Sequence, residues 1–406
     1  MPREIQKIIV MGLGYIGLPT ASMLATKGHQ VLGVDVNETA VNIINSGRIH
    51  IVEPDLDILV RSAVNSGNLR AALLPEEGDT FILAVPTPFK EENGNLKAPD
   101  LSYVQAATRA IAPFLREGNL VILESTSPVG TTEVVEQIIL DLRPELAGKV
   151  HCAHCPERVL PGQILRELVD NDRIIGGTSK AALAKARTLY KTFCNGAILE
   201  TDSRTAELSK LVENSFRDVN IAFANELSLI CDRLGVNVWE TIALANRHPR
   251  VNILQPGPGV GGHCIAVDPW FIVSSAPAEA RLIRTAREVN DAKPHWVLEK
   301  VRAKAQRFRD PIIGCLGLTF KANIDDMRES PSMDIVQRLR ESQIGTVLAC
   351  DPNVASDKVP FPLFELKDVL KQADILLLLV DHTEFTEIDP QMIKDKVVID
   401  TKGVLR

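Results

Sequence analysis

The chain of 406 residues is long enough for two or three domains around a large buried core. Its formal net charge of −7 gives no general electrostatic case for binding nucleic acid or acidic membranes. Because we find no apolar run of about 20 residues, no signal peptide, and 7 scattered cysteines rather than a disulfide framework, we expect a soluble cytoplasmic protein.

The first half of the chain alternates short apolar strands with helical segments. A helix is expected at residues 18–27, and strands are expected at residues 7–11, 31–34, 81–85, 120–124, 151–153 and 173–176. Such alternation predicts an α/β fold, with a Rossmann-type doubly wound parallel sheet. We assign residues 1–203 to this domain.

Residues 204–308 are predicted to form a central all-α segment. A stretch at 203–234 contains neither Pro nor Gly and is apolar around much of its circumference, which predicts burial against other helices or a second subunit. A second helix is expected at 281–308, with Pro294 as a potential break. Residues 309–406 return to alternation and predict a smaller C-terminal α/β Rossmann-like domain, with a helix at 332–342 and strands at 312–316, 346–350, 375–380 and 397–400.

The turn after the first strand carries a dinucleotide-binding pattern, Gly12-Leu-Gly-Tyr-Ile-Gly17. It follows a strand and opens a helix, and Asp35 ends the next strand, as NAD sites require for the pyrophosphate and the ribose hydroxyls. The two residues after Asp35, Val36 and Asn37, include no arginine that could bind a 2′-phosphate, so NAD is favoured over NADP. The alternative is a Gly-rich turn that binds nothing. The candidate cofactor residues here are Gly12, Gly14, Tyr15, Ile16, Gly17 and Asp35.

Two hydroxyl residues, Thr87 and Thr126, stand just beyond the ends of later strands. Open α/β sheets bind ligands at this edge, so both are candidates to line the cofactor crevice. By themselves they are more typical of proline-containing turns that cap helices.

The loop at residues 257–268 delivers Cys264 among four glycines, with Asp268 four residues later. Glycines let the backbone approach a ligand closely, and a thiol beside a carboxylate is typical of a nucleophile. The alternative is a flexible turn with a small apolar side chain. Beside a nicotinamide cofactor, such a thiol suggests oxidation through a covalent thioester.

Lys210, Asn214 and Arg217 lie at i, i+4 and i+7 of the predicted long helix and therefore share one stripe. A polar stripe on a largely apolar helix suggests a lined cavity, and a solvated face is the alternative. Lys210 could stabilise an oxyanion or carry a proton.

Residues 151–155 contain two His and two Cys, but strand residues alternate faces and no second pair stands at zinc-finger spacing. We therefore expect no metal site. Glu157 follows the same strand and is expected to face the cleft. Arg247, His248 and Arg250, and later Lys321 and Arg328, form cationic clusters suited to a diphosphate or carboxylate, or else solvated loops.

These motifs together resemble the UDP-sugar 6-dehydrogenase family, essentially from end to end. The resemblance rests on the glycine turn, Glu124-Ser-Thr126, Cys155-Pro-Glu-Arg158, Lys210 with Asn214, the Gly-Gly-His-Cys264 loop with Asp268, and Phe320-Lys-Ala-Asn323. It implies oxidation of a nucleotide-sugar C6 alcohol to a carboxylate with two NAD⁺ in succession.

The resemblance also implies roles for individual residues. Cys264 would attack the C6 aldehyde and form a thiohemiacetal and then a thioester, Lys210 and Asn214 would stabilise the oxyanion, and Asp268 with Glu157 or Thr126 would activate water. Arg328 would contact the cofactor. The implied substrate-binding residues are Arg158, Val159, Lys210, Asn214, Arg217, His248, Arg250, Gly261 and Lys321. Family members are generally dimers or larger, so His248 and Arg250 would reach a neighbouring active site.

Two positions depart from the UDP-glucose enzymes of the family. Val267 stands where they have Lys, and Pro161 stands where they have a second Glu. Both changes resemble the branch that acts on 2-acetamido sugars, which implies UDP-N-acetyl-D-mannosamine as substrate, UDP-N-acetylglucosamine as the alternative, and a uronic acid for surface polysaccharide as product. Two rivals remain: a two-electron hydroxyacid dehydrogenase, which needs no cysteine nucleophile, and a nucleotide-sensing Rossmann protein without turnover.

Overall fold

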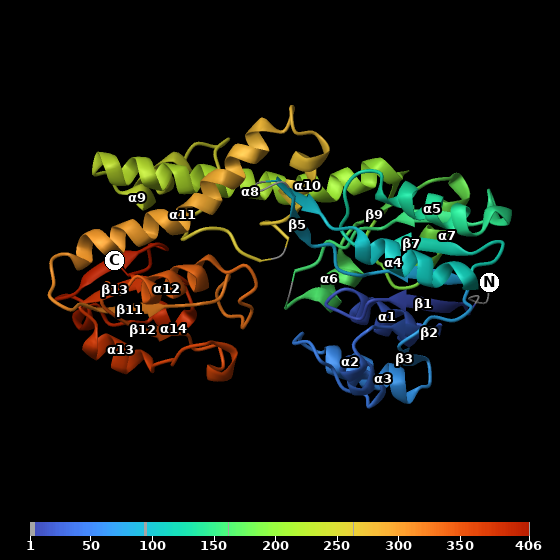
Figure 1. Ribbon diagram of the computed structural model, residues 1–406, viewed down its shortest axis with the longest axis horizontal. Coiled ribbons are helices and arrows are strands. Elements are labelled where there is room, and N and C mark those ends of the chain that lie inside the picture. The colour runs from blue at the N-terminus through green and yellow to red at the C-terminus, as the bar shows by residue number, and fades with distance from the viewer. Residues whose placement is uncertain (1–4, 93–95, 161, 263, 406) are drawn as a thin grey trace. The chain divides into compact units, whose positions relative to one another are not determined.

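The computed structural model describes residues 5–92, 96–160, 162–262 and 264–405. The chain divides into two compact units, Met1–Val212 and Glu213–Arg406, and Figure 1 shows their elements. Helix α8, Ser203–Leu234, crosses the division. The three-part division expected from the sequence, at 203/204 and 308/309, stays a prediction.

The first unit is built on a sheet of eight strands within the described residues, in the order β10-β9-β8-β7-β4-β1-β2-β3. Neighbouring strands pair in parallel except β8 with β9. The strands are β1 (Lys7–Met11), β2 (Gln30–Val34), β3 (Leu69–Ala72), β4 (Thr80–Leu83), β7 (Leu120–Leu123), β8 (His151–His154), β9 (Arg173–Gly177) and β10 (Ile198–Asp202). The predicted doubly wound sheet is confirmed, and the chain reverses strand order beside β1.

Helices cover both faces of this sheet, and each face has its own core. Along β1, Ile8 and Val10 belong to one apolar cluster, while Ile9 and Met11 belong to the other. Burial on both faces explains why the strands are apolar runs rather than alternating ones. The helices are α1 (Gly17–Thr26), α2 (Glu38–Asn45), α3 (Leu56–Asn65), α4 (Ser102–Ile111), α5 (Thr131–Leu142), α6 (Ile164–Asp170) and α7 (Lys180–Tyr190), and a separate hairpin pairs β5 (Phe89–Glu92) with β6 (Leu96–Pro99).

The second unit combines helices with a parallel sheet in the order β12-β11-β13-β14. Its elements are α9 (Val238–Ala245), α10 (Asp268–Ser275), α11 (Arg281–Ala305), β11 (Ile312–Leu316), α12 (Pro331–Glu341), β12 (Thr346–Cys350), α13 (Leu366–Gln372), β13 (Ile375–Leu378), α14 (Thr383–Thr386) and β14 (Val397–Asp400). The central helices and the smaller C-terminal α/β domain are thus confirmed. Helix α11 continues through Pro294 without the break considered above.

No helix among the described residues is long and apolar enough to cross a membrane.

Candidate active site

The glycine turn after β1 is shaped by close packing. Gly12 has φ +91°, and a Cβ there would lie 2.6 Å from the carbonyl oxygen of Ala84, while a Cβ at Gly17 would collide with the Gly12 carbonyl. Gly14 is exposed and has no heavy atom within 4 Å of a Cβ position. The first and third glycines are therefore needed for packing, and the second leaves open space where a pyrophosphate can approach. Tyr15 and Ile16, both half-buried, lead into α1.

Asp35, directly after β2, braces the same turn. Its carboxylate accepts hydrogen bonds from the backbone N–H of Leu13 (2.9 Å) and of Asn37 (2.9 Å). The next side chain, Val36, is 95% exposed and brings no positive charge. The turn and the carboxylate thus fit the adenosine ribose and pyrophosphate of NAD, and nothing here favours a 2′-phosphate.

Thr87 and Thr126 lie together at the carboxyl ends of the paired strands β4 and β7. The Thr87 hydroxyl donates to the carbonyl oxygen of Thr126 at 2.6 Å. One residue earlier, the Ser125 hydroxyl donates to the Val85 carbonyl at 2.7 Å. These bonds join two loops at the sheet edge where open α/β folds bind ligands.

Helix α8 is tied to this edge by Glu207, one turn before Lys210. The buried Glu207 carboxylate accepts from the N–H of Gly130 (2.6 Å) and of Thr132 (2.7 Å), at the N-terminus of α5. Burial raises the pKa of Glu207 despite these hydrogen bonds. Lys210 is itself only 9% exposed. Burial lowers the pKa of His154 to about 3, with a smaller contribution from Lys210, so this imidazole stays neutral.

Glu157 takes part in a buried ion cluster. The Arg173 guanidinium lies 2.9 Å from Glu157 and 3.9 Å from a second carboxyl, Glu124, which also accepts a hydrogen bond from the Tyr190 hydroxyl at 3.1 Å. Burial, reinforced by the charge of Glu157, raises the pKa of Glu124 to about 8. One residue further on, Arg158 donates to the carbonyl oxygen of Asp172 at 3.0 Å. Val159 packs against the adjacent apolar core.

In the second unit, Cys264 lies just ahead of α10. Its carbonyl accepts from the N–H of Asp268 at 2.8 Å, and the Asp268 carboxylate accepts from the Asn214 amide at 2.5 Å. All 7 cysteines of the chain are described, and only Cys264 is exposed. Burial raises the pKa of Cys315 and of Cys350 to about 12, so these two thiols stay protonated at neutral pH.

The cysteine loop packs against the loop that follows β11. A Cβ at Gly261 would lie 2.5 Å from the carbonyl oxygen of Glu329 and 2.7 Å from the Cβ of Phe320. Gly262 has φ +80° and donates its N–H to the Arg328 carbonyl at 3.1 Å. Only glycine fits this contact, so the cysteine loop and the 318–330 loop form one packed surface.

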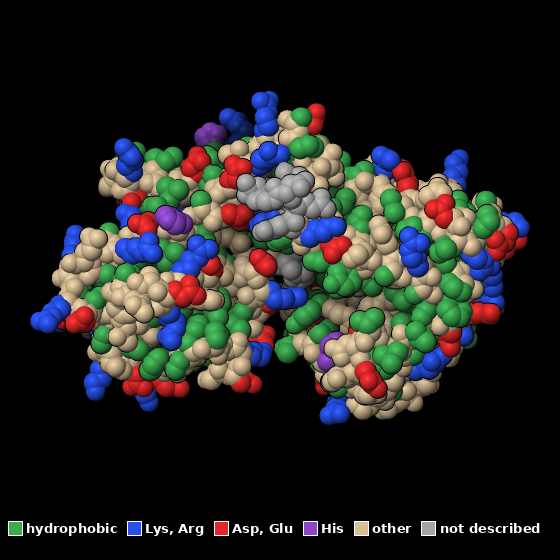
Figure 2. Space-filling model, in the orientation of Figure 1, with side chains coloured by type: hydrophobic (Ala, Val, Ile, Leu, Met, Phe, Trp, Pro, Cys, Tyr) green, Lys and Arg blue, Asp and Glu red, His purple; other side chains and the backbone are tan. Residues whose placement is uncertain are grey.

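The remaining predicted residues are exposed in the second unit. The Arg328 guanidinium pairs with Asp326 at 2.6 Å. Arg217, Lys321, His248 and Arg250 are all exposed, the first on α8, the second after β11, and the last two in the turns after α9. Pro161 and His263, which carry part of the sequence resemblance, lie outside the described residues. Figure 2 shows positive and negative side chains interspersed over the visible face. The anionic groups of a ligand would therefore be bound by individual Lys and Arg side chains rather than by a broad positive surface.

Sequence reasoning missed Glu207, Arg173 and Glu124 as residues that support the site. Each of the three contacts a partner that is distant in the sequence. The one feature of the sequence that could have indicated them is a charged residue within an otherwise apolar stretch. Among the described residues, no group of three or more His, Cys, Asp or Glu side chains is placed to hold a metal ion.

A doubly wound sheet with this glycine turn, joined to a unit with one exposed thiol, defines an NAD-dependent oxidoreductase. Three models of the UDP-glucose/GDP-mannose dehydrogenase family match the chain: the NAD binding domain at residues 6–194, the central domain at 204–292 and the UDP binding domain at 314–406. The chain belongs to this family. It is an NAD-dependent UDP-sugar dehydrogenase, as the family resemblance implied.

Relatives match over nearly the full length. An NDP-N-acetyl-D-galactosaminuronic acid dehydrogenase of Ralstonia nicotianae is 58% identical, covering 99% of this chain and 96% of the relative. A UDP-N-acetyl-D-mannosamine dehydrogenase of Yersinia pestis is 54% identical, covering 99% of each. The solved UDP-N-acetyl-mannosamine dehydrogenase of Staphylococcus aureus is 43% identical with a TM-score of 0.87, covering 98% of this chain and 95% of that one.

Proposed function

We propose that this protein oxidises C6 of UDP-N-acetyl-D-mannosamine from the alcohol to the carboxylate, giving UDP-N-acetyl-D-mannosaminuronate. The observation that carries the proposal is Cys264, the one exposed thiol of the chain, which is presented on a glycine loop beside the buried Asn214–Asp268 pair. Bound NAD⁺ supplies the hydride acceptor for each of the two oxidations, so two NAD⁺ are reduced per sugar.

The chemistry at Cys264 balances with these two oxidations. In the first oxidation a hydride leaves C6 and a proton leaves its hydroxyl, which turns the alcohol into an aldehyde. The thiolate adds to the aldehyde carbon, and the oxyanion takes up a proton to give a thiohemiacetal. Loss of a second hydride from C6 and of the hydroxyl proton leaves a thioester. Water then breaks the C–S bond, which releases the acid and restores the thiol.

Other side chains have assigned roles in this proposal. Lys210 and Asn214 stabilise the oxyanion that forms at C6. Asp268, whose carboxylate is held by the Asn214 amide, orients or activates water together with Glu157 or Thr126. Proposed substrate contacts are Arg158, Val159, Arg217, His248, Arg250, Gly261 and Lys321, with Arg328 on the cofactor.

We also propose a homodimer or larger assembly formed through α8. Phe216, Phe223 and Ile230 recur every seven residues along this helix and are 68%, 56% and 46% exposed. A repeat of this kind forms a seam for a second helix. In such an assembly the exposed His248 and Arg250 would serve a neighbouring subunit. The proposed setting is the cytoplasm, and the proposed end use is a surface polysaccharide.

A second substrate is favoured by one specific observation. The Ralstonia relative, at 58% identity, is named for an N-acetyl-galactosaminuronic acid, so the galacto-configured UDP-sugar is the competing candidate. The two sugars differ in ring configuration and share the 2-acetamido group and the C6 alcohol. The proposed chemistry at Cys264 is therefore the same for both.

The test counts NADH released per sugar consumed with UDP-N-acetylmannosamine, UDP-N-acetylgalactosamine, UDP-N-acetylglucosamine and UDP-glucose in parallel. Two NADH with the mannosamine sugar are expected. Two with another sugar would replace the substrate and keep the chemistry, whereas one NADH per product would refute the thioester route. Cys264→Ala should abolish acid formation, with Cys231→Ala, at a buried thiol, as the matched control.

A further inference from the structure

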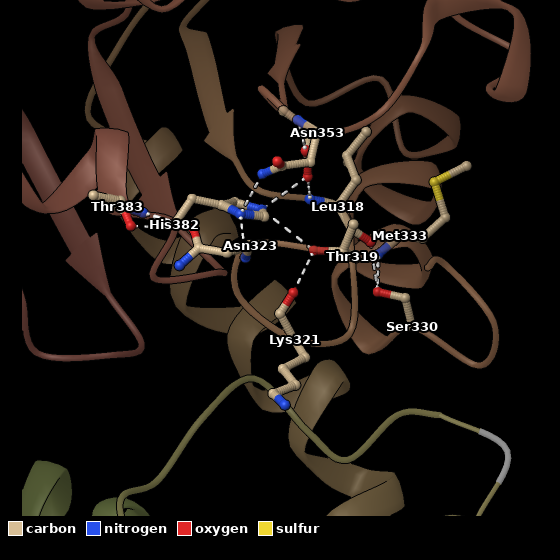
Figure 3. A network of polar contacts seen from close by, with 10 residues as sticks. Leu318, Thr319, Lys321, Asn323, Ser330, Met333, Asn353, His382 and Thr383 are labelled. Atoms are coloured by element: carbon tan, nitrogen blue, oxygen red, sulfur yellow. Dashed lines mark hydrogen bonds and ion pairs between the residues drawn. The ribbon is translucent and has the colours of Figure 1, made fainter. Parts of the chain in front are cut away.

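His382 is a fully buried imidazole at the ligand-binding edge of the C-terminal sheet. It follows β13 and touches residues that follow β11, the strand paired with β13, and β12, the strand paired with the other side of β11. Its Nδ1 lies 3.0 Å from the backbone nitrogen of Asn323 and 2.9 Å from the side-chain nitrogen of Asn353. Its Nε2 lies 3.1 Å from the Asp351 carboxylate. Figure 3 shows these contacts converging on the ring.

The contacts fix which nitrogen carries the proton. Because Nδ1 accepts the backbone N–H of Asn323, it is unprotonated, and Nε2 carries the proton that is donated to Asp351. Asp351 also accepts from the backbone N–H of Leu318 at 2.7 Å and of Asn353 at 2.9 Å. Burial opposes ionisation of Asp351, but hydrogen bonds from His382 and these N–H groups lower its pKa overall. The pair is thus a neutral imidazole oriented by a carboxylate.

This pair holds the 318–323 segment at both ends. Asp351 binds the N–H of Leu318, His382 binds the N–H of Asn323, and between them the Thr319 hydroxyl donates to the Lys321 carbonyl at 2.8 Å. Asn323 has φ +60°, a left-handed conformation that Asn adopts more readily than most other non-glycine residues. The Lys321 side chain extends away from the network (Figure 3).

We propose that His382, oriented by Asp351, is a positioning residue for nucleotide-sugar binding. It fixes the backbone from Thr319 to Asn323 so that Lys321 presents its ammonium group to the UDP moiety. The same backbone sets Phe320, whose ring packs against Gly262 of the cysteine loop. The inference rests on the proposed substrate contact of Lys321, and it makes the imidazole part of the support for that contact.

The test measures UDP binding to the full-length protein by calorimetry, with no sugar and no turnover. His382→Leu keeps the bulk and removes both hydrogen bonds, so UDP affinity should fall about tenfold, the effect of one lost charged contact. His382→Gln offers an acceptor and a donor at similar positions and should recover most of the affinity. Ile375→Val, in the core of the same sheet, lowers stability without touching the 318–323 segment and should bind UDP as the wild type does.

Two further readouts separate positioning from a general structural effect. The KM for the UDP-sugar should rise in His382→Leu while the KM for NAD⁺ stays unchanged. Adding His382→Leu to Lys321→Met should weaken UDP binding no further than Lys321→Met alone, because both changes remove the same contact. Additive losses, or unchanged UDP affinity in His382→Leu, would overturn the inference. Failure of all sugars to turn over with normal UDP binding would instead count against the proposed function.

Discussion

The buried cluster around Arg173 gives the strongest test of how charge is distributed in the first unit. Two carboxyls face one guanidinium, and the pKa of Glu124 is raised from 4.5 to about 8 because the group is buried and lies near the charge of Glu157. Glu124 is therefore expected to be protonated in the folded protein at neutral pH. Glu124→Gln should then reproduce the folded-state shape and charge, including acceptance from the Tyr190 hydroxyl.

The magnitude follows from proton linkage. A carboxyl whose pKa is higher in the folded state stabilises the fold fully below pH 4.5 and loses that contribution as pH rises through about 8. Each pH unit inside this window corresponds to about 1.4 kcal/mol. From pH 5 to pH 7.5 the wild type should therefore lose about 3 kcal/mol that Glu124→Gln does not lose.

The assay is urea denaturation of both proteins at pH 5, 6.2 and 7.5. The free energy of unfolding of Glu124→Gln, relative to wild type, should rise steadily across the series. Glu157→Gln is the matched control: it is also isosteric but removes the carboxylate 2.9 Å from Arg173, and it should destabilise the fold by about 3 kcal/mol at pH 7. A Glu124→Gln difference that stays constant with pH would show that Glu124 is already ionised in the folded protein and refute the reasoning.

Three further changes have expected outcomes. Glu207→Ala removes a buried cap of α5 and should lower the free energy of unfolding by about 2–3 kcal/mol. Glu133→Ala, in an exposed ion pair, should lower it by at most about 1 kcal/mol. Equal losses in urea denaturation would contradict the role of Glu207 as a buried helix cap. Asp35→Ser combined with Val36→Arg should move the kcat/KM preference from NAD toward NADP, and an unshifted preference would place the ribose elsewhere. Burial lowers the pKa of Lys293 to about 7, so the free energy of unfolding of the wild type should fall as pH drops from about 10 to 7. Lys293→Met should reduce this dependence of the unfolding free energy on pH in denaturation curves. An unchanged pH dependence would count against the lowered pKa.

Local patterns in the sequence predicted most of the fold. The turn at Gly12 and the strands around it combine apolar runs with glycines at fixed spacing, and both signals lie within a few residues. Strands β3 and β10 lie at the two edges of the sheet and were missed. The sequence of β3, Leu-Arg-Ala-Ala, is only four residues long and contains a charge, and that of β10, Ile-Leu-Glu-Thr-Asp, is polar over its last three positions. Sequence periodicity detects burial, and edge strands are the least buried.

The supporting residues of the site depend on long-range contacts and could not be predicted. Glu207 meets Thr132 across 75 positions, and His382 meets Asn323 across 59. A single sequence holds no periodic signal for such pairs, because only the folded topology brings the ends of separate strands together. The cysteine loop could be singled out since its unusual composition is itself local.

The burial of the cysteines determines where oxidation would first damage this protein. Peroxides react with thiolates that they can reach. Six of the seven cysteine side chains are buried in the core, and one is exposed. Chemical damage would begin at Cys264 on the surface loop and leave the packed interior intact. With Cys264 in its proposed role as nucleophile, loss of activity would precede loss of structure, and thiol titration of the native protein would count the molecules that can still react.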